Sequence, residues 1–201
     1  MEKEIKDTLA LNSSKWIKLV EEIEDKQNAE IWREYLDENN FEVIVPEMVL
    51  KEVLLLLTKK ESTEVWEEKE RHFFRLIESG KKFDFKHIKT RHDRDYYYTC
   101  AEIFIKKHKI KQILKEKGLC RIIGGKEHYA LHKDDLAILI SLKELGKIYY
   151  FITHDNGLRD ALEIAEIRNA LVEEGICFIL LHETQIPKNR QIRRIKVLPG
   201  Y

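Results

Sequence analysis

Two uninterrupted apolar runs, with a helical pattern between them, dominate the C-terminal half of the chain. The first run covers residues 147–152 and the second covers residues 175–181. Between them Leu158, Leu162 and Leu171 recur at the spacing of one helix face. Apolar runs without polar alternation are typical of parallel strands that are buried on both faces. The pattern therefore predicts two neighbouring parallel strands joined by a helix.

Further strand and helix patterns extend this arrangement toward the N-terminus. Residues 133–142 form an acid-led apolar helix pattern directly before the first run. Residues 41–45 are typical of a short strand closed by Pro46, because proline cannot donate to a strand ladder. A helix with an apolar stripe is expected from Glu47 onward. Strands that feed helices in this way indicate an α/β fold.

The first forty residues are expected to be mainly helical. Asn12 and Ser13 are suited to cap a helix, and Trp16 and Leu19 begin an apolar pattern with helical spacing. Before them, Ile5 stands almost alone among charged residues and does not predict a buried central strand.

The middle of the chain is less regular and is interpreted as decoration on the α/β core. Helical patterns cover residues 63–79 and 96–117. The whole segment, about 60–130, has too few apolar residues to bury a core of its own. We therefore expect a single domain over residues 1–201, with a helical insertion at 60–130 and a basic tail at 187–201.

Charge and cysteine content limit the classes of function. The chain has 36 basic and 36 acidic residues, so no global positive field attracts nucleic acid or a membrane. Its three cysteines are odd in number and widely spaced, which favours a reduced, cytoplasmic setting. No apolar run approaches the roughly 20 residues that span a bilayer. A nucleic-acid partner must therefore be recognised through a local patch.

Two basic clusters are the candidates for such a patch. One covers residues 81–94 and the other covers residues 188–196, although clusters of this kind also occur on ordinary solvated faces. The side chains expected to contact nucleic acid are Lys86, Lys89, Arg91, Arg94, Arg190, Arg193 and Arg194.

Three acids fall at similar places in the strand and helix units. Glu52 lies in the helix after the first predicted strand, Asp135 leads the helix before the third, and Asp155 follows that third strand. Such places converge on one edge of a parallel sheet. Clustered carboxylates repel one another unless a cation neutralises them, and Mg²⁺ or Mn²⁺ with oxygen ligands would do so. Thr153 is expected to orient Asp155 or a metal-bound water.

Each acid also suits an ordinary structural role. Asp135 also suits the role of an ordinary acid at a helix start, and Asp134 competes with it as the alternate ligand. Glu52 lies on a helix rich in lysine and glutamate and is equally suited to a solvated position. Asp155 begins Asp-Asn-Gly, which is also typical of a turn.

Three segments resemble PIN-domain nucleases. Val-Pro-Glu-Met-Val-Leu-Lys-Glu, residues 45–52, is similar to the strand, proline and helix segment of that family. Asp-Leu-Ala-Ile-Leu at 135–139 resembles its acid-led helix, and Thr-His-Asp at 153–155 resembles its strand ending in an acid. The resemblance covers residues 41–57 and 133–181, about a third of the chain.

This resemblance implies a fold and an activity. The expected fold is a three-layer α/β/α domain with a central, mostly parallel sheet of about four or five strands. The implied activity is a Mg²⁺- or Mn²⁺-dependent endonuclease, acting on RNA rather than DNA, with Glu52, Asp135 and Asp155 as metal ligands.

The first acid of the family's pattern has no clear counterpart. Asp7 is the candidate, although the family's opening strand ends in its acid and here only Ile5 precedes it as an apolar residue. Substitutes for this ligand are Asp37, Asp84, Asp134 and Asp160.

Two further functions follow from the same features. The apparent lack of the family's first strand favours a catalytically inactive PIN-like scaffold that binds nucleic acid or protein through the two basic clusters. A toxin held by an antitoxin, or a homo-oligomer, is also compatible with the sequence.

Overall fold

A computed structural model gives the architecture of the chain. It describes residues 7–13, 34, 38, 41–50, 52, 71, 85–88, 90–183 and 192–199. The predicted helical patterns over most of residues 1–40 and over 63–79 lie outside this part of the chain.

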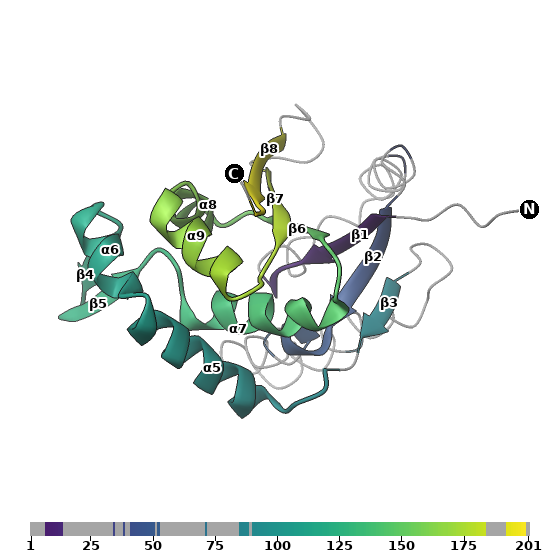
Figure 1. The fold of residues 1–201 in the computed structure, drawn as a ribbon, viewed down its shortest axis with the longest axis horizontal. Helices are drawn as coiled ribbons and strands as arrows, with labels where there is room; N and C mark the ends of the chain where they lie inside the picture. Colours follow the sequence, from purple (N-terminus) through teal and green to yellow (C-terminus); the bar gives the residue numbers. More distant parts are fainter. Residues whose placement is uncertain are drawn as a thin grey trace, which may run out of the picture.

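A six-stranded sheet forms the centre of the described structure (Figure 1). The strand order is β3-β2-β1-β6-β7-β8, and all neighbours are parallel except the last pair, in which β8 is antiparallel to β7. The predicted mostly parallel sheet is confirmed, with β8 added at its edge. The strands are β1 (Asp7–Leu11), β2 (Phe41–Pro46), β3 (Phe85–Ile88), β6 (Tyr149–Thr153), β7 (Phe178–Glu183) and β8 (Ile192–Val197).

Helices and one hairpin surround this sheet. The α5 helix packs on α7, and the β4–β5 hairpin projects beside α6 (Figure 1). No described helix is long and apolar enough to cross a membrane. The elements are α5 (Arg94–Lys107), α6 (Ile110–Glu116), β4 (Cys120–Ile123), β5 (Lys126–Tyr129), α7 (Lys133–Leu142), the 3-10 helix η1 (Lys143–Leu145), α8 (Asn156–Leu162) and α9 (Ala165–Glu173).

The β1 strand lies in the middle of the sheet, between β2 and β6. Its residues Leu9, Ala10 and Leu11 are at most 1% exposed. Because successive side chains point to opposite faces, burial of all three means that both faces of the strand are covered. The same holds for Phe151 and Ile152 of β6. The layered α/β/α prediction is thereby confirmed.

The predicted boundaries need several corrections. An opening strand was not expected, yet the apolar run after Asp7 forms β1. The helical pattern at 96–117 is two helices, because Lys109 between them has a positive φ. The segment 60–130 also supplies β3 and β5, and the basic tail supplies β8, whereas the short strand that the sequence suggests at 119–123 is present as β4. The predicted elements around residues 41–45, 133–142, 147–152 and 175–181 are present as β2, α7, β6 and β7.

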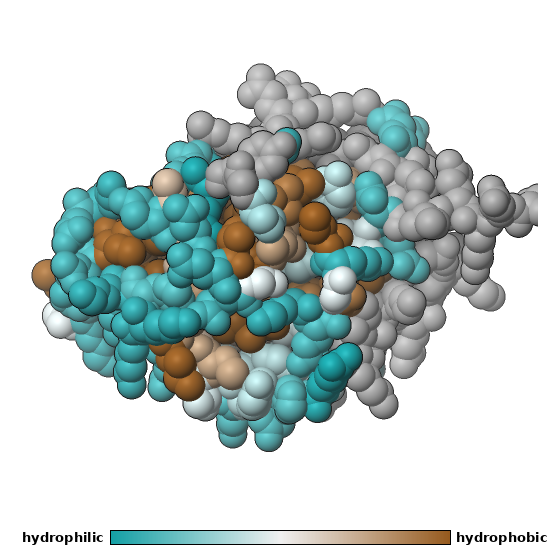
Figure 2. All heavy atoms as spheres, in the orientation of Figure 1, coloured by the Kyte–Doolittle hydropathy of each residue, from teal (hydrophilic) through white to brown (hydrophobic). Residues whose placement is uncertain are grey.

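Hydropathy differs between the centre and one end of the molecule. Figure 2 shows apolar residues between the helices in the middle of the face in view, whereas the end formed by α5, α6 and the hairpin is largely hydrophilic. The hairpin nevertheless exposes Ile122 and Ile123.

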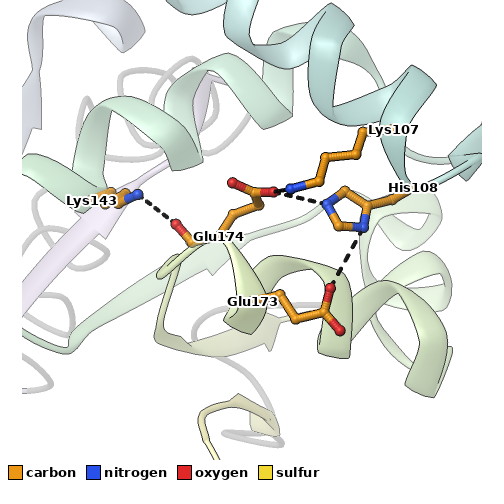
Figure 3. A network of polar contacts seen from close by, with 5 residues as sticks. All are labelled: Lys107, His108, Lys143, Glu173 and Glu174. Atoms are coloured by element: carbon orange, nitrogen blue, oxygen red, sulfur yellow. Dashed lines mark hydrogen bonds and ion pairs between the residues drawn. The ribbon is translucent and has the colours of Figure 1, made fainter.

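Glu174, the residue that ends α9, connects three elements (Figure 3). Its carboxylate accepts from Lys107 Nζ at 2.5 Å and lies 3.0 Å from His108 Nε2, at the end of α5. Its backbone carbonyl accepts from Lys143 Nζ at 2.5 Å. Cations at the last carbonyls of a helix complement its dipole. This network fixes α5 against α9 at the edge of the sheet where β6 and β7 begin.

Candidate active site

Hydrogen bonds join the carboxyl ends of the two central strands, β1 and β6. The backbone N–H of Asn12 donates to the Ile152 carbonyl at 3.2 Å, which continues the ladder past the end of β1. The Asn12 side-chain amide donates to Thr153 Oγ1 at 2.7 Å, and both residues are buried. Thr153 Oγ1 also accepts from the N–H of Asp155 at 3.0 Å. Thr153 therefore fixes the backbone of Asp155 relative to β1.

Asp155 is the N-cap of α8. Its Oδ1 accepts from the N–H groups of Gly157 at 2.7 Å and Leu158 at 3.2 Å. Aspartate is favoured here because its oxygen satisfies N–H groups that have no partner inside the helix. The structural role of Asp155 is therefore that of a helix cap rather than a turn, and it uses only one carboxylate oxygen.

Gly157 brings the start of α8 against the segment that leads into α7. A Cβ at this position would lie 3.0 Å from the Ala130 carbonyl oxygen and 3.1 Å from Asp155 Oδ1. These distances are tighter than ordinary van der Waals contact, so glycine fits here without displacing the neighbouring backbone. The contact holds Asp155 close to the N-terminus of α7, where Asp135 lies.

Asp135 is the most buried acid at this edge of the sheet. Its Oδ2 accepts from the N–H of His132, the N-cap of α7, at 3.3 Å. Burial, together with the nearby Asp155 and Glu52 carboxylates, raises the pKa of Asp135 to about 8. Asp135 therefore stays protonated at neutral pH unless a cation replaces the proton.

Glu52 is the second acid whose ionisation is opposed. The Ser13 hydroxyl, one residue beyond Asn12, donates to Glu52 Oε2. Burial raises the pKa of Glu52, and the Asp134 carboxylate adds to this, while the Ser13 hydrogen bond and the Arg94 charge act in the opposite direction. Glu52 thus interacts with Ser13 at the end of β1 and with Asp134 at the start of α7, so these two ends and the helix after β2 lie close together.

Asp134 faces α5 as well as the other acids. Burial raises the pKa of Tyr98 to about 12, and a hydrogen bond to Asp134 acts in the same direction. Arg94 Nη2 donates to the Tyr98 hydroxyl at 3.0 Å. Asp134 is half-buried and Asp135 is buried, so the sequence-based preference for Asp135 as the inward-facing acid agrees with this geometry.

The donor set fits a hard divalent cation in its chemistry. Carboxylate oxygens are the ligands that Mg²⁺ prefers, and the cost of ionising Asp135 beside Asp155 and Glu52 falls when a cation is bound. Within the described residues, no three histidine, cysteine, aspartate or glutamate side chains lie close enough together to hold a metal ion as they stand. Mg²⁺ usually takes one or two carboxylates and keeps several waters, so direct ligation by three acids is not required.

Asp7 does not reach this site, which corrects its assignment as a ligand. It is exposed, begins β1 and pairs with Phe41 at the start of β2, so it lies at the amino edge of the sheet. A rise of roughly 3.3 Å per residue places it about 16 Å from Asn12. The substitute Asp160 is held by Arg159 Nε at 2.7 Å on α8. Asp37 and Asp84 lie outside the described residues.

Asn12 and Ser13 are the site residues that the sequence analysis missed. They were interpreted as a helix cap and not assigned to the site, and the preceding apolar run Leu9–Ala10–Leu11 was the signal that they also follow a strand. Residues that follow a buried parallel strand belong to the carboxyl edge of the sheet.

The predicted nucleic-acid contacts are spread over several elements. Arg94 lies beside the acids, and the exposed Arg91 donates its backbone N–H to Glu144. Lys86 lies on β3, and Arg193 and Arg194 lie on β8, where they pair with His182 and Leu181 of β7. Lys89 and Arg190 lie outside the described residues.

Comparisons with known proteins give distant structural likenesses only. No protein-family model and no curated protein sequence matches the chain. A crystal structure of VapBC2 from Rickettsia felis bound to a DNA fragment from their promoter is similar at a TM-score of 0.43 and 14% identity, covering 77% of this chain and 92% of that one. FitAcB from Neisseria gonorrhoeae is similar at a TM-score of 0.40 and 18% identity, covering 78% and 94%. The function is therefore inferred from the side chains of the site.

Proposed function

We propose that this protein is a metal-dependent endonuclease that hydrolyses phosphodiester bonds, with RNA as its substrate. The proposal is supported chiefly by the buried carboxyl of Asp135, whose ionisation is opposed by Asp155 and Glu52 at the carboxyl edge of the sheet. Acids arranged in this way favour a doubly charged cation. The preference for RNA comes from the resemblance to PIN-domain nucleases.

In this proposal Glu52, Asp135 and Asp155 hold Mg²⁺ or Mn²⁺, either directly or through the waters that the ion keeps. Such an ion, when bound, lowers the pKa of its water and neutralises charge on the phosphate oxygens. Thr153 is a positioning residue because its hydroxyl holds the Asp155 backbone. Ser13 has a similar role toward Glu52.

A matched pair of variants on α8 tests the proposal. Asp155→Asn keeps the helix cap, because asparagine caps as well as aspartate, but removes the negative charge. Asp160→Asn makes the same change five positions away, where Arg159 binds the carboxylate. We expect Asp155→Asn to lower the rate of Mn²⁺-dependent cleavage of single-stranded RNA by about 100-fold or more, and Asp160→Asn to leave it within about threefold. Equal rates in the two variants would refute the assignment of Asp155.

A second candidate is a catalytically inactive scaffold that binds nucleic acid. It is favoured by Asn12, an amide at the carboxyl end of the central strand, where an acid would add another metal ligand. Titration with Mn²⁺ separates the two functions. The nuclease requires saturable binding at millimolar Mn²⁺ or below, with release of a proton from Asp135, whereas the scaffold requires neither.

A further inference from the structure

A cavity of about 720 Å³ opens beside the acidic site. It lies between α5, α6 and the β4–β5 hairpin and reaches the N-terminus of α7. His132 lines this cavity, and its backbone N–H donates to Asp135 Oδ2. His132 therefore belongs both to the lining of the cavity and to the hydrogen bonds of the acidic site.

The lining of this cavity carries an excess of positive charge. Its charged residues are four lysines and two glutamates, namely Lys106, Lys109, Lys111, Lys133, Glu102 and Glu127. Both glutamates are already neutralised, since Glu102 pairs with Lys133 at 2.8 Å and Glu127 pairs with Lys115 at 2.6 Å. Lys106 and Lys109 are exposed and make no ion pair with any described residue. The lining can thus bind anions.

Lys109 has a backbone conformation that points to a role for its side chain. It has φ 51° and ψ 36°, the left-handed region, and no other non-glycine residue in the described chain has a positive φ. Glycine or asparagine adopts this conformation at lower cost. A lysine at this junction of α5 and α6 is unfavourable for the fold. Residues in unfavourable conformations often mark functional positions.

Aromatic side chains accompany the lysines. Lys111 Nζ lies 5.3 Å from the centre of the half-buried Tyr129 ring, and Lys133 Nζ lies 5.0 Å from the centre of the Tyr98 ring. Positive side chains that alternate with aromatic rings are typical of surfaces that bind unpaired nucleic acid, where cations contact phosphates and rings stack on bases. The volume lies within the roughly 300–1,000 Å³ of small-ligand pockets, which suits a nucleotide-sized segment better than a duplex.

We propose that the cavity between α5, α6 and the β4–β5 hairpin binds an unpaired segment of nucleic acid, with Lys106, Lys109 and Lys111 contacting its phosphates. The further idea that this segment is the substrate on its way to the acids rests on the proposed nuclease function. In that case the strand would continue past His132 to the acidic site. Neither basic cluster found in the sequence includes these lysines, and they come together only through the turn between α5 and α6.

Two lysine-to-glycine variants test this proposal. Lys109→Gly removes one cation from the cavity and relieves the left-handed backbone, so Tm is expected to stay constant or to rise. Lys147→Gly removes one cation at the amino end of β6, on the opposite edge of the sheet. Binding of a short unstructured RNA is measured by fluorescence anisotropy in EDTA, without cleavage, over a range of salt concentrations. Loss of one phosphate contact should reduce the slope of log K against log salt by about 0.7 in magnitude and weaken binding by roughly three- to tenfold.

The outcomes separate this proposal from the proposed function. If the salt dependence of RNA binding is reduced in Lys109→Gly and unchanged in Lys147→Gly, the proposal that the cavity binds nucleic acid is supported. This holds even when no cleavage is found with Mn²⁺. The same slope in both variants would refute the proposal that the cavity binds nucleic acid, even if the protein cleaves RNA. Equal affinity for a duplex of the same sequence would overturn the preference for an unpaired strand.

Discussion

The side-chain amide of Asn12 donates a 2.7 Å hydrogen bond to the Thr153 hydroxyl, although the two residues lie 141 positions apart in the sequence. This bond joins the ends of the two central strands and is buried. An amide therefore stands beside the acids at a place where a carboxylate would add negative charge.

Asn12→Asp should lower the stability of the metal-free protein and raise its affinity for a metal ion. Aspartate has the same shape, but it lacks the donor for Thr153 and adds a charge near Asp155. We expect a lower Tm without metal and a larger increase in Tm on addition of Mn²⁺ than the native protein shows. Asn12→Ala serves as the control, since it loses the hydrogen bond without adding a ligand. An Mn²⁺ effect no larger than that of native protein would contradict the expectation.

Gly157→Ala should disturb the acidic site through packing alone. The added Cβ would lie 3.0 Å from the Ala130 carbonyl oxygen, so either the start of α8 or the backbone at Ala130 must shift by a few tenths of an ångström. We expect a loss of about 1–3 kcal/mol in the free energy of unfolding, measured with denaturant, together with reduced Mn²⁺ affinity. Gly125→Ala is the comparison, because nothing lies within 4 Å of its added Cβ and only its positive φ is strained. Its Mn²⁺ affinity should be unchanged.

Stability should depend on pH through Asp135. The pKa of Asp135 is about 8 in the fold and about 3.8 in the unfolded chain, so the folded state holds a proton that the unfolded state releases. The free energy of unfolding without metal should therefore fall as pH rises from about 4 to about 8. The raised pKa of Glu52 acts in the same direction.

Two comparisons test the origin of this pH dependence. Asp135→Asn removes the titrating group and should give a flatter curve in denaturant unfolding. Saturating Mn²⁺ should also flatten the curve, because it favours the ionised carboxylate. A native curve as flat as that of Asp135→Asn would show that Asp135 does not titrate in this range.

Thr8→Val should stabilise the protein. Thr8 Oγ1 on β1 is buried and has no hydrogen-bond partner among the described residues. Valine has the same shape and removes the unsatisfied hydroxyl, so we expect a gain of about 1 kcal/mol, or roughly 2–4 °C in Tm. Thr153→Val makes the identical change on β6, where the hydroxyl accepts two hydrogen bonds, and should lower Tm. Scanning calorimetry of the two variants checks the contrast in sign.

The sequence predicted the interior of the sheet better than its edges. Strands β2, β6 and β7 were predicted because burial on both faces requires a nearly continuous apolar run. The edge strand β8 was interpreted as a basic tail, because its buried Ile195 and Val197 alternate with exposed Lys196. Charged residues are common on edge strands, where they oppose pairing with other chains.

The acids were predicted more readily than the residues that hold them. Asp135 and Asp155 begin helices next to apolar runs, so topology alone brings them to the same edge of the sheet. Asp7 was misassigned because an acid beside a short apolar run marks the start of a strand as well as its end. The lysines that line the cavity between α5, α6 and the β4–β5 hairpin are scattered over residues 106–133, and the turn at Lys109 brings them together.

The central position of β1 means that its two neighbouring strands emerge at very different times during synthesis. During synthesis, β1 finds β2 about thirty residues later, but its other neighbour, β6, emerges only after more than a hundred further residues. Until then one edge of β1 has no strand to pair with, and an open apolar edge invites association with other nascent chains. Sheet closure depends on contacts distant in sequence, so folding should be slow for a domain of this size and should benefit from chaperones that shield the first strand pair.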